Sequence, residues 1–193
     1  MFSQYEEEKY ILEGVGSEPG RFLDIGAHDG KTFSNTYRLV ELGWSGLLVE
    51  PSIESFSSLL ALHGGNQKLT LIHAAVGLER CLVKFWNSPD AVSTTCQAHY
   101  DLWKHATHFS GCFYVPQITL VELFNQFGGP FHFINIDTEG TSADLFLSLP
   151  LAVMLPRAVC VEHDGRVVEC MAHAQAAGYK ASYLNETNLV LVR

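Results

Sequence analysis

The sequence predicts an α/β fold in which helices cover both faces of a mostly parallel sheet. Three observations predict it. Short apolar strands alternate with amphipathic helices along the 193 residues. The first strand, 22–25, runs into a turn bounded by Gly26 and Gly30, and the second strand, 47–50, ends in a carboxylate. Two last strands, at 180–184 and 188–192, predict a closing antiparallel hairpin.

The individual elements follow from periodicity and from the residues that begin and end them. Strand 81–86 alternates apolar and polar residues, so we expect it outside the central sheet. The remaining expected elements are a helix over 4–14, a helix over 32–42 that begins at Lys31, a helix from Pro51 and Ser52 to Gly64, strand 69–74, strand 113–115, helix 120–127, strand 131–137, helix 142–149, strand 158–163 and helix 166–177.

Length and composition suit one folded unit. With 193 residues, 47% of them hydrophobic, the chain can bury one sizeable core. We therefore expect a single domain over 1–193, with 1–19 as a helical lead-in.

Charge and cysteine content exclude several partners. The net charge is −9 and no run of Lys or Arg could neutralise phosphates, so no nucleic-acid partner is expected. The acidic N-terminus does not resemble a signal peptide, and no apolar run reaches membrane-spanning length, so no membrane association is expected. Five cysteines without a C-x-x-C pair indicate reduced thiols in the cytoplasm. The oligomeric state is left open.

The turn after the first strand and the carboxylate after the second predict a nucleoside site. The amides of a helix beginning at Lys31 would face a ligand carboxylate or phosphate, and Glu50 would accept hydrogen bonds from both ribose hydroxyls. A dinucleotide fingerprint needs glycines where His28 and Lys31 stand, so pyrophosphate is disfavoured. Asp24 either contacts the ligand or holds the turn through backbone amides.

Four motifs, in order, resemble those of the FkbM-type methyltransferases, which belong to class I of the enzymes that use S-adenosylmethionine (SAM). They are Asp24-Ile-Gly-Ala-His-Asp-Gly30 with Phe33-Ser-Asn-Thr36, Gly43-Trp-Ser-Gly-Leu-Leu-Val-Glu-Pro51, His73-Ala-Ala-Val-Gly77, and Ile134-Asn-Ile-Asp-Thr-Glu-Gly140 with Val161-Glu-His163. The resemblance implies a Rossmann-like three-layer α/β/α sandwich with a seven-stranded sheet. It also implies methyl transfer to a hydroxyl of a small molecule, commonly a sugar or secondary metabolite. Asn135 departs from the pattern, since Lys is frequent there, and Thr141-Ser-Ala replaces the usual Ala-Glu.

The same resemblance places the cofactor along the first turn and the ends of the next strands. The residues assigned to SAM are Asp24, Gly26, Ala27, His28, Gly30, Ser34, Asn35, Glu50, Pro51, Ser52, Ala74, Ala75 and Asp137.

The chemistry is expected beyond the fourth strand. The first and fourth strands are neighbours in this sheet order, so the first turn should face Asp137 and Glu139, with His163 next along. Transfer to an alcohol needs a base, and these three residues are the candidates. A second route is Mg²⁺ or Mn²⁺ held by Asp137, Glu139 and Asp164, which would lower the acceptor pKa. The alternative interpretation is structural: the two strand-end carboxylates cap the next helix, and His163 is a satisfied strand-end histidine.

Residues 88–111 form a long connection, polar at 93–95 and rich in aromatic residues and histidine from His99 to Phe109. We predict an acceptor lid, because such a segment can order over a ligand and exclude water. His99, His105 and His108 lack a complete tetrahedral ligand spacing, which favours an aromatic lid over a metal site. Two other functions remain: a SAM-binding partner or regulatory protein without catalysis and, more distantly, a nucleotide-binding oxidoreductase.

Overall fold

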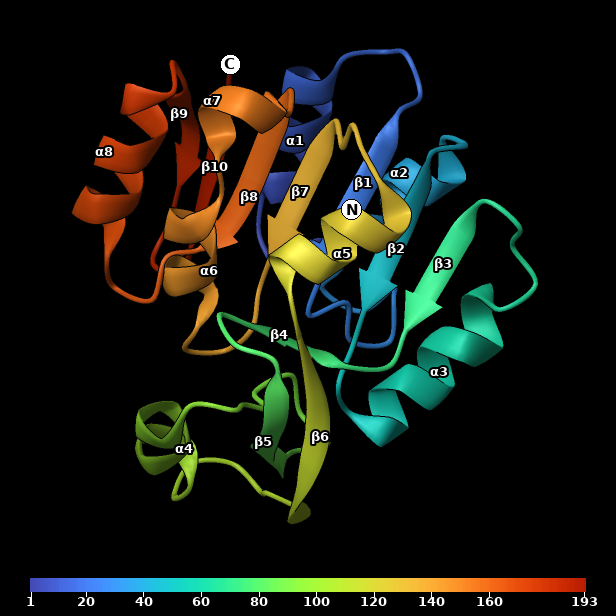
Figure 1. The fold of residues 1–193 in the computed structure, drawn as a ribbon, viewed down its shortest axis with the longest axis vertical. Helices are drawn as coiled ribbons and strands as arrows, with labels where there is room; N and C mark the ends of the chain where they lie inside the picture. Colours follow the sequence, from blue (N-terminus) through green and yellow to red (C-terminus); the bar gives the residue numbers. More distant parts are fainter.

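A seven-stranded sheet forms the centre of the computed structural model, which describes residues 1–193. The strand order is β3-β2-β1-β7-β8-β10-β9 (Figure 1). β10 runs antiparallel to both its neighbours, and the other paired strands are parallel. The predicted mostly parallel sheet with its C-terminal hairpin is therefore confirmed. The strands are β1 (Arg21–Ile25), β2 (Ser45–Val49), β3 (Leu69–Ile72), β7 (Phe133–Ile136), β8 (Ala158–Glu162), β9 (Lys180–Leu184) and β10 (Asn188–Val192).

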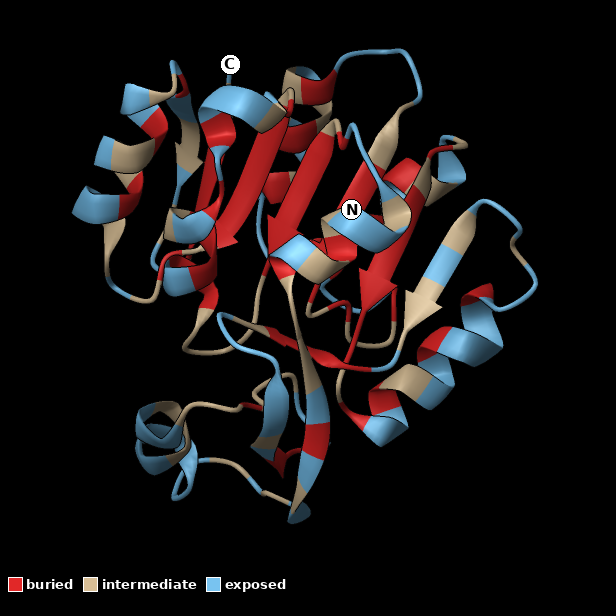
Figure 2. Cartoon of the chain, viewed as in Figure 1, coloured by how far each residue is buried: buried red, intermediate tan, exposed pale blue.

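Helices cover both faces of this sheet and make the three layers. One face carries α1 (Glu7–Val15), α2 (Tyr37–Glu41) and α3 (Ile53–His63); the other carries α5 (Leu120–Phe127), α6 (Ser142–Ser148), α7 (Leu151–Met154) and α8 (Val167–Ala176). The inner strands are buried on both sides, as Figure 2 shows. Their side chains alternate between two apolar clusters, one under each helical layer. Double burial explains why these strands are continuous apolar runs.

A second, three-stranded sheet lies beyond the carboxyl ends of the parallel strands (Figure 1). It consists of β4 (Ala75–Gly77), β6 (Gly111–Thr119) and β5 (Cys81–Asn87), in that order, and α4 (Gln97–Trp103) lies between β5 and β6 in the chain. The prediction that 81–86 lies outside the central sheet is confirmed. β6 is longer than the expected strand 113–115. β4 and α7, of three and four residues, were not predicted, because such short elements carry no periodic signal.

The prediction of a helix that begins at Lys31 was wrong, because α2 begins only at Tyr37. The Asp29 carboxylate accepts hydrogen bonds from the amides of Lys31 (2.8 Å) and Thr32 (2.7 Å) and captures them in a local turn. Phe33 then adopts a positive φ of 56°, outside helical geometry. These amides are therefore not available to a ligand. The other shared elements differ from expectation at their ends by a few residues.

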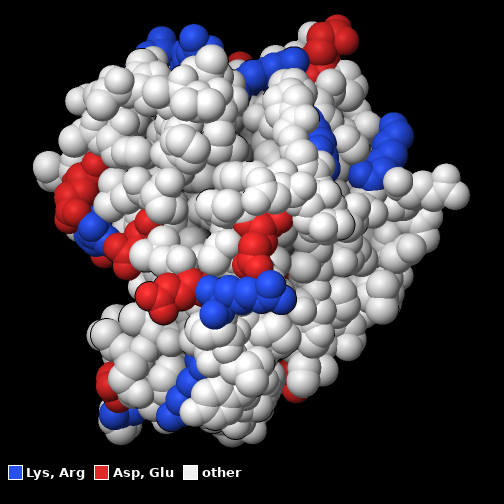
Figure 3. Space-filling model, in the orientation of Figure 1, with Lys and Arg blue, Asp and Glu red and all other residues white.

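The N-terminal lead-in is tied to the C-terminal hairpin. α1 packs against β8, β9 and β10, and the buried Glu7 carboxylate accepts hydrogen bonds from the side-chain amides of Asn185 (2.8 Å) and Asn188 (3.0 Å). Every helix of the chain is too short or too polar to cross a membrane. On the face drawn in Figure 3, Lys and Arg side chains are scattered; some lie beside Asp and Glu and others lie apart from them.

Candidate functional site

A pocket of about 290 Å³ opens at the carboxyl ends of the parallel strands, between the two sheets. This edge is where open α/β sheets bind ligands. Most of the residues assigned to SAM from the sequence line it: Asp24, Gly26, Ala27, His28, Ser34, Asn35, Glu50, Pro51, Ala74, Ala75 and Asp137. Gly30 and Ser52 do not. Phe33, Val76 and Phe85 line it without having been assigned to it, and several residues of 90–95, from the segment predicted as a lid, line it as well.

The first turn is pressed against the end of β7. Gly26 has φ +84°, and a Cβ built there would lie 1.6 Å from the Asp137 carbonyl oxygen. Its amide and that of Ala27 donate to the Val49 carbonyl at 2.9 and 3.1 Å, which fixes the turn to β2 as well. Only glycine fits this position. Gly30, in contrast, packs against Leu59 and His63 rather than toward the pocket.

Glu50 is held in place from both sides. Its Oε2 accepts from the His28 amide at 2.8 Å and its Oε1 from the Ser52 amide at 2.7 Å. An ionised carboxylate has about four acceptor positions, so two remain for a ligand. Burial raises the pKa of Glu50 to about 7. Ser52 itself caps α3, accepting from the Ser55 amide at 3.3 Å, which explains why it does not line the pocket.

Asp24 accepts hydrogen bonds within a buried polar network and does not bind the backbone amides of the turn. Its Oδ1 accepts from Asn135 Nδ2 (2.8 Å) and its Oδ2 from Thr36 Oγ1 (2.5 Å). Asn35 Nδ2 in turn donates to Asn135 Oδ1 (3.0 Å). The alternative in which Asp24 holds the turn through backbone amides was wrong, because side-chain donors from β7 and the loop before α2 bind both its oxygens.

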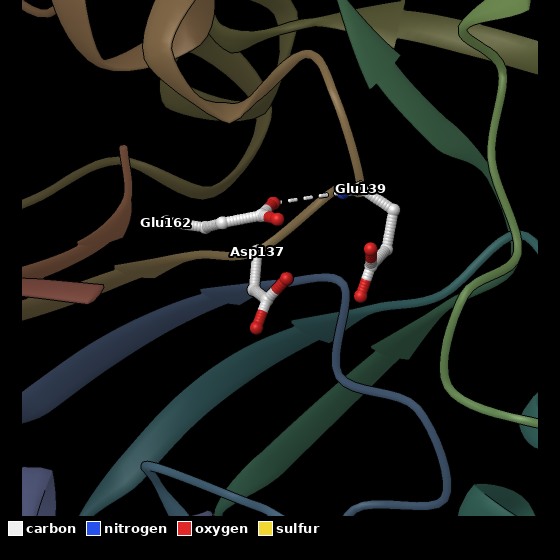
Figure 4. Close-up of side chains that lie close together, drawn as sticks. All are labelled: Asp137, Glu139 and Glu162. Carbon is white, nitrogen blue, oxygen red and sulfur yellow. Dashed lines mark hydrogen bonds between the residues drawn. The ribbon is translucent and has the colours of Figure 1, made fainter. Parts of the chain in front are cut away.

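Three carboxyl groups meet beyond β7 and β8 (Figure 4). One oxygen each of Asp137, Glu139 and Glu162 lies within 4.8 Å of the others. Glu162 Oε2 accepts from the Glu139 amide at 3.1 Å and from Ser142 Oγ at 2.8 Å. We call these three residues the carboxyl cluster.

The carboxyl cluster differs from the predicted ligand set in one member. Asp164, expected beside Asp137 and Glu139, accepts from the Ala143 amide at 2.8 Å and so serves the first turn of α6. That leaves the two strand-end carboxylates without the capping role considered from sequence. Glu162 takes the place of Asp164 and was missed. Its signal was a carboxylate at the end of an apolar strand, the same signal that singled out Glu50.

Mutual repulsion and burial control protonation in the cluster. Burial, reinforced by Glu162 and Glu139, raises the pKa of Asp137 well above its usual range. Burial and the charges of Glu162 and Asp164 raise the pKa of Glu139 to about 9, and burial also raises that of Glu162. The cluster therefore keeps its protons to a higher pH than exposed carboxyl groups do, unless a cation compensates the negative charge.

The segment 88–111 reaches the cluster through two residues. His99 Nε2 lies 3.0 Å from Glu139 Oε2, and Thr94 Oγ1 donates to the Glu139 carbonyl at 2.5 Å. Burial lowers the pKa of His99. His105 and His108 are exposed, and the three histidines form no group that could hold a metal ion. Sequence had placed His99 in the segment without a partner.

His163 does not line the pocket. Its Nδ1 accepts from the Gly165 amide at 3.1 Å, and its Nε2 lies 3.2 Å from the Asn185 carbonyl. Both ring nitrogens are therefore used by backbone, which favours the structural interpretation of this strand-end histidine over its role as a base.

A family model described as the methyltransferase FkbM domain matches residues 24–179. The chain belongs to this family. A crystal structure of the methyltransferase FkbM from Methylobacillus flagellatus KT is similar to this FkbM domain, with a TM-score of 0.60. The two sequences are 12% identical, and the match covers 91% of this chain and 44% of that one. At this identity the likeness supports the fold alone. The FkbM domain thus spans less than half the length of that solved chain. A comparison with curated proteins gave no match.

Membership in the FkbM family implies SAM as the methyl donor. The pocket fits that group on three counts. Glu50 keeps free acceptor positions for the ribose hydroxyls, the Gly26 turn allows close approach of the main chain, and Asn35 presents a buried oxygen, Oδ1, that has no partner in the protein.

Proposed function

We propose that this FkbM domain transfers the methyl group of SAM to a hydroxyl of a small molecule such as a sugar or secondary metabolite. The observation that carries the proposal is that the turn assigned to the cofactor and two members of the carboxyl cluster, Asp137 and Glu139, line one pocket. An alcohol must lose its proton as it attacks, and the cluster supplies groups that can take it.

The residues divide the work by position. Glu50 would hold the ribose, and the Gly26 turn would carry the aminoacyl end of SAM, which supplies an electrophilic methyl group when bound. Glu139 is the leading proton acceptor, because it lines the pocket and its Oε2 lies 3.0 Å from His99 Nε2, which can take up the proton that the carboxyl group holds at neutral pH and so free it to act as a base. Asp137 lies beside it and would orient the acceptor hydroxyl.

A divalent cation is the alternative route on the same residues. Carboxylate oxygens are the ligands that Mg²⁺ and Mn²⁺ prefer, and the carboxyl cluster offers three within 4.8 Å. A cation there would lower the pKa of a bound hydroxyl and replace the strong base. In this version Glu162 stands in the ligand set where Asp164 was expected.

A binding protein without catalysis is the second candidate function. It would be favoured if the carboxylates only capped helices. Ser142 begins α6, yet the cap of that helix comes from Asp164, and Asp137 and Glu139 are left facing the pocket. This arrangement supports an enzyme over a binding module.

The test is release of S-adenosylhomocysteine (SAH) in the presence of a panel of hydroxylated, amine and thiol acceptors. We expect turnover with a hydroxyl acceptor, and a loss of about 100-fold or more in Glu139→Gln and Asp137→Asn, in the range of general acid–base catalysis. Glu169→Gln, an exposed carboxylate on α8, is the matched control. Transfer only to amines or thiols would contradict O-methylation, and SAH binding without turnover on any acceptor would favour the binding module.

A further inference from the structure

A buried oxygen without a partner lines the pocket. Asn35 is 7% exposed, and its Oδ1 accepts no hydrogen bond within the protein. Buried polar atoms are rarely left unpaired, because the desolvation they suffer is then uncompensated. Asn35 Oδ1, in the loop before α2, is therefore free to accept a hydrogen bond from a ligand in the pocket.

The orientation of the Asn35 amide is fixed by its neighbours. The Asp24 carboxyl oxygen Oδ1 is an acceptor, so Asn135 turns its amide nitrogen toward it and its Oδ1 toward Asn35. Asn35 must therefore donate to Asn135 through Nδ2, which also donates to Cys160 Sγ at 3.5 Å. Flipping the Asn35 amide would set two acceptor oxygens against each other. We call Asp24, Asn135 and Asn35 the amide relay.

The relay explains a departure in the sequence. Asn135 stands where Lys is frequent in the resembling family, and a Lys would place a positive charge directly beside Asp24. Asn135 instead donates to Asp24 and accepts from Asn35 Nδ2, so the Asn35 oxygen is left free to accept a hydrogen bond in the pocket. Burial raises the pKa of Asp24, yet a proton on Oδ2, beside Thr36, leaves Oδ1 an acceptor and the relay unchanged.

The position of Asn35 selects the donor. Glu50 follows β2 and would take the ribose hydroxyls, whereas Asn35 contacts β7 and β8 through Asn135 and Cys160, on the other side of β1. A SAM molecule with its ribose at Glu50 and its aminoacyl end on the Gly26 turn reaches Asn35 with that end. The α-ammonium is the donor there, and the carboxyl groups of Asp24 and Asp137, which also line the pocket, favour a cation.

We propose that Asn35 Oδ1 accepts a hydrogen bond from the α-ammonium of SAM, and that the amide relay makes the pocket selective for the amino group of the cofactor. The inference rests on the proposed function. It makes Asn35 a binding residue and Asp24 and Asn135 the residues that position it.

The experiment is calorimetry with SAH and with its desamino analogue, in which hydrogen replaces the α-amino group. A charge-assisted hydrogen bond predicts that wild-type protein binds the analogue about 10- to 100-fold more weakly. In Asn35→Ala the same change of ligand should cost less than about threefold, because the acceptor is gone. Asn135→Leu breaks the relay, so the ratio of the dissociation constants of the desamino analogue and SAH should be smaller in this variant than in the wild type.

Two results would overturn the inference. One is a wild-type ratio below about threefold, which needs no variant and so does not depend on whether Asn35→Ala folds. The other is an unchanged ratio in Asn35→Ala or in the smaller polar variant Asn35→Ser. If wild-type protein binds neither SAM nor SAH, the proposed function fails as well; if it binds both with no selectivity for the amino group, only the role of Asn35 fails.

Discussion

The Nε2 atom of His99 lies 3.0 Å from the Oε2 atom of Glu139, across the gap between the segment 88–111 and the end of β7. Burial lowers the pKa of the histidine and raises that of the glutamate to about 9. At neutral pH the pair therefore holds one proton on the carboxyl group, facing a neutral imidazole. Through this contact Glu139 can pass its proton to His99, which lies outside the pocket lining.

His99→Ala should lower turnover about tenfold or more while leaving SAH affinity within about threefold, because His99 acts through Glu139 and touches no assigned cofactor residue. Turnover kinetics and calorimetry on the same preparation measure both. His105→Ala is the matched control, since His105 is exposed in the same segment. Equal turnover in the two variants would assign His99 a purely structural role.

Chelation separates the two routes through the carboxyl cluster. If Glu139 is the base, turnover should be unchanged in EDTA. If Mg²⁺ or Mn²⁺ is held by the cluster, EDTA should abolish turnover and either ion should restore it. Glu162→Gln sharpens the distinction, because it removes a ligand of the cation but not the assigned base. A chelator-resistant enzyme that keeps full activity in Glu162→Gln would exclude the cation route.

Stability should fall with rising pH because of Glu139. Its carboxyl group has a usual pKa of 4.5 in the unfolded chain and about 9 in the folded protein. Between these values the folded state binds the extra proton, so the free energy of unfolding decreases as the pH rises from about 5 to 9. Urea unfolding at several pH values should show a shallower decrease in Glu139→Gln than in wild type. Parallel curves for the two proteins would contradict the raised pKa.

Cofactor affinity should depend on pH in the opposite direction, through Glu50. The ribose hydroxyls donate to the ionised carboxylate, and burial raises its pKa to about 7 in the free protein. SAH should therefore bind more tightly as the pH rises from about 6 to 8, with release of a proton. Glu50→Gln should remove this dependence, and Glu50→Ala should weaken binding by about 10- to 100-fold. Calorimetry in buffers of different ionisation enthalpy measures the proton; its absence in wild type would argue against Glu50 as the ribose ligand.

The fold was predictable where local sequence and tertiary structure agree. β1 and β7 are apolar runs bounded by turn residues, and the capping box of Thr119 and Glu122 begins α5 where the periodicity predicts it. The helix at Lys31 failed because one side chain, Asp29, captured its first amides. Local patterns of apolar residues do not weigh such a competition.

The site was predictable only as far as its residues follow one another in the chain. The first turn, Glu50 and the residues after β7 were found because each ends a strand. Glu162 and His99 meet the cluster through the pairing of β7 with β8 and through the docking of 94–99 on the Glu139 turn. The spacing of residues along the sequence does not predict that docking. The unpaired oxygen of Asn35 likewise depends on amide orientations set by residues far away in sequence.

Residues 88–111 should order over the acceptor. α4 has no buried residue, and its contacts with the rest of the protein include the His99–Glu139 pair and the stacking of Tyr100 on Trp86, whose ring centroids lie 5.0 Å apart. Few buried contacts mean low local stability, which a ligand can raise. Hydrogen exchange should therefore show weak protection at 97–103 in the free protein, little change with SAH, and a clear increase when an acceptor is added to the SAH complex. β6, at 111–119, serves as the internal control, because it is paired with β5 over 111–117 and with β4 over 117–119 and should not change. Strong protection of 97–103 in the free protein would instead mark the segment as a permanent wall of the pocket, and acceptor choice would then depend on the fixed residues at 90–95 and 137–141.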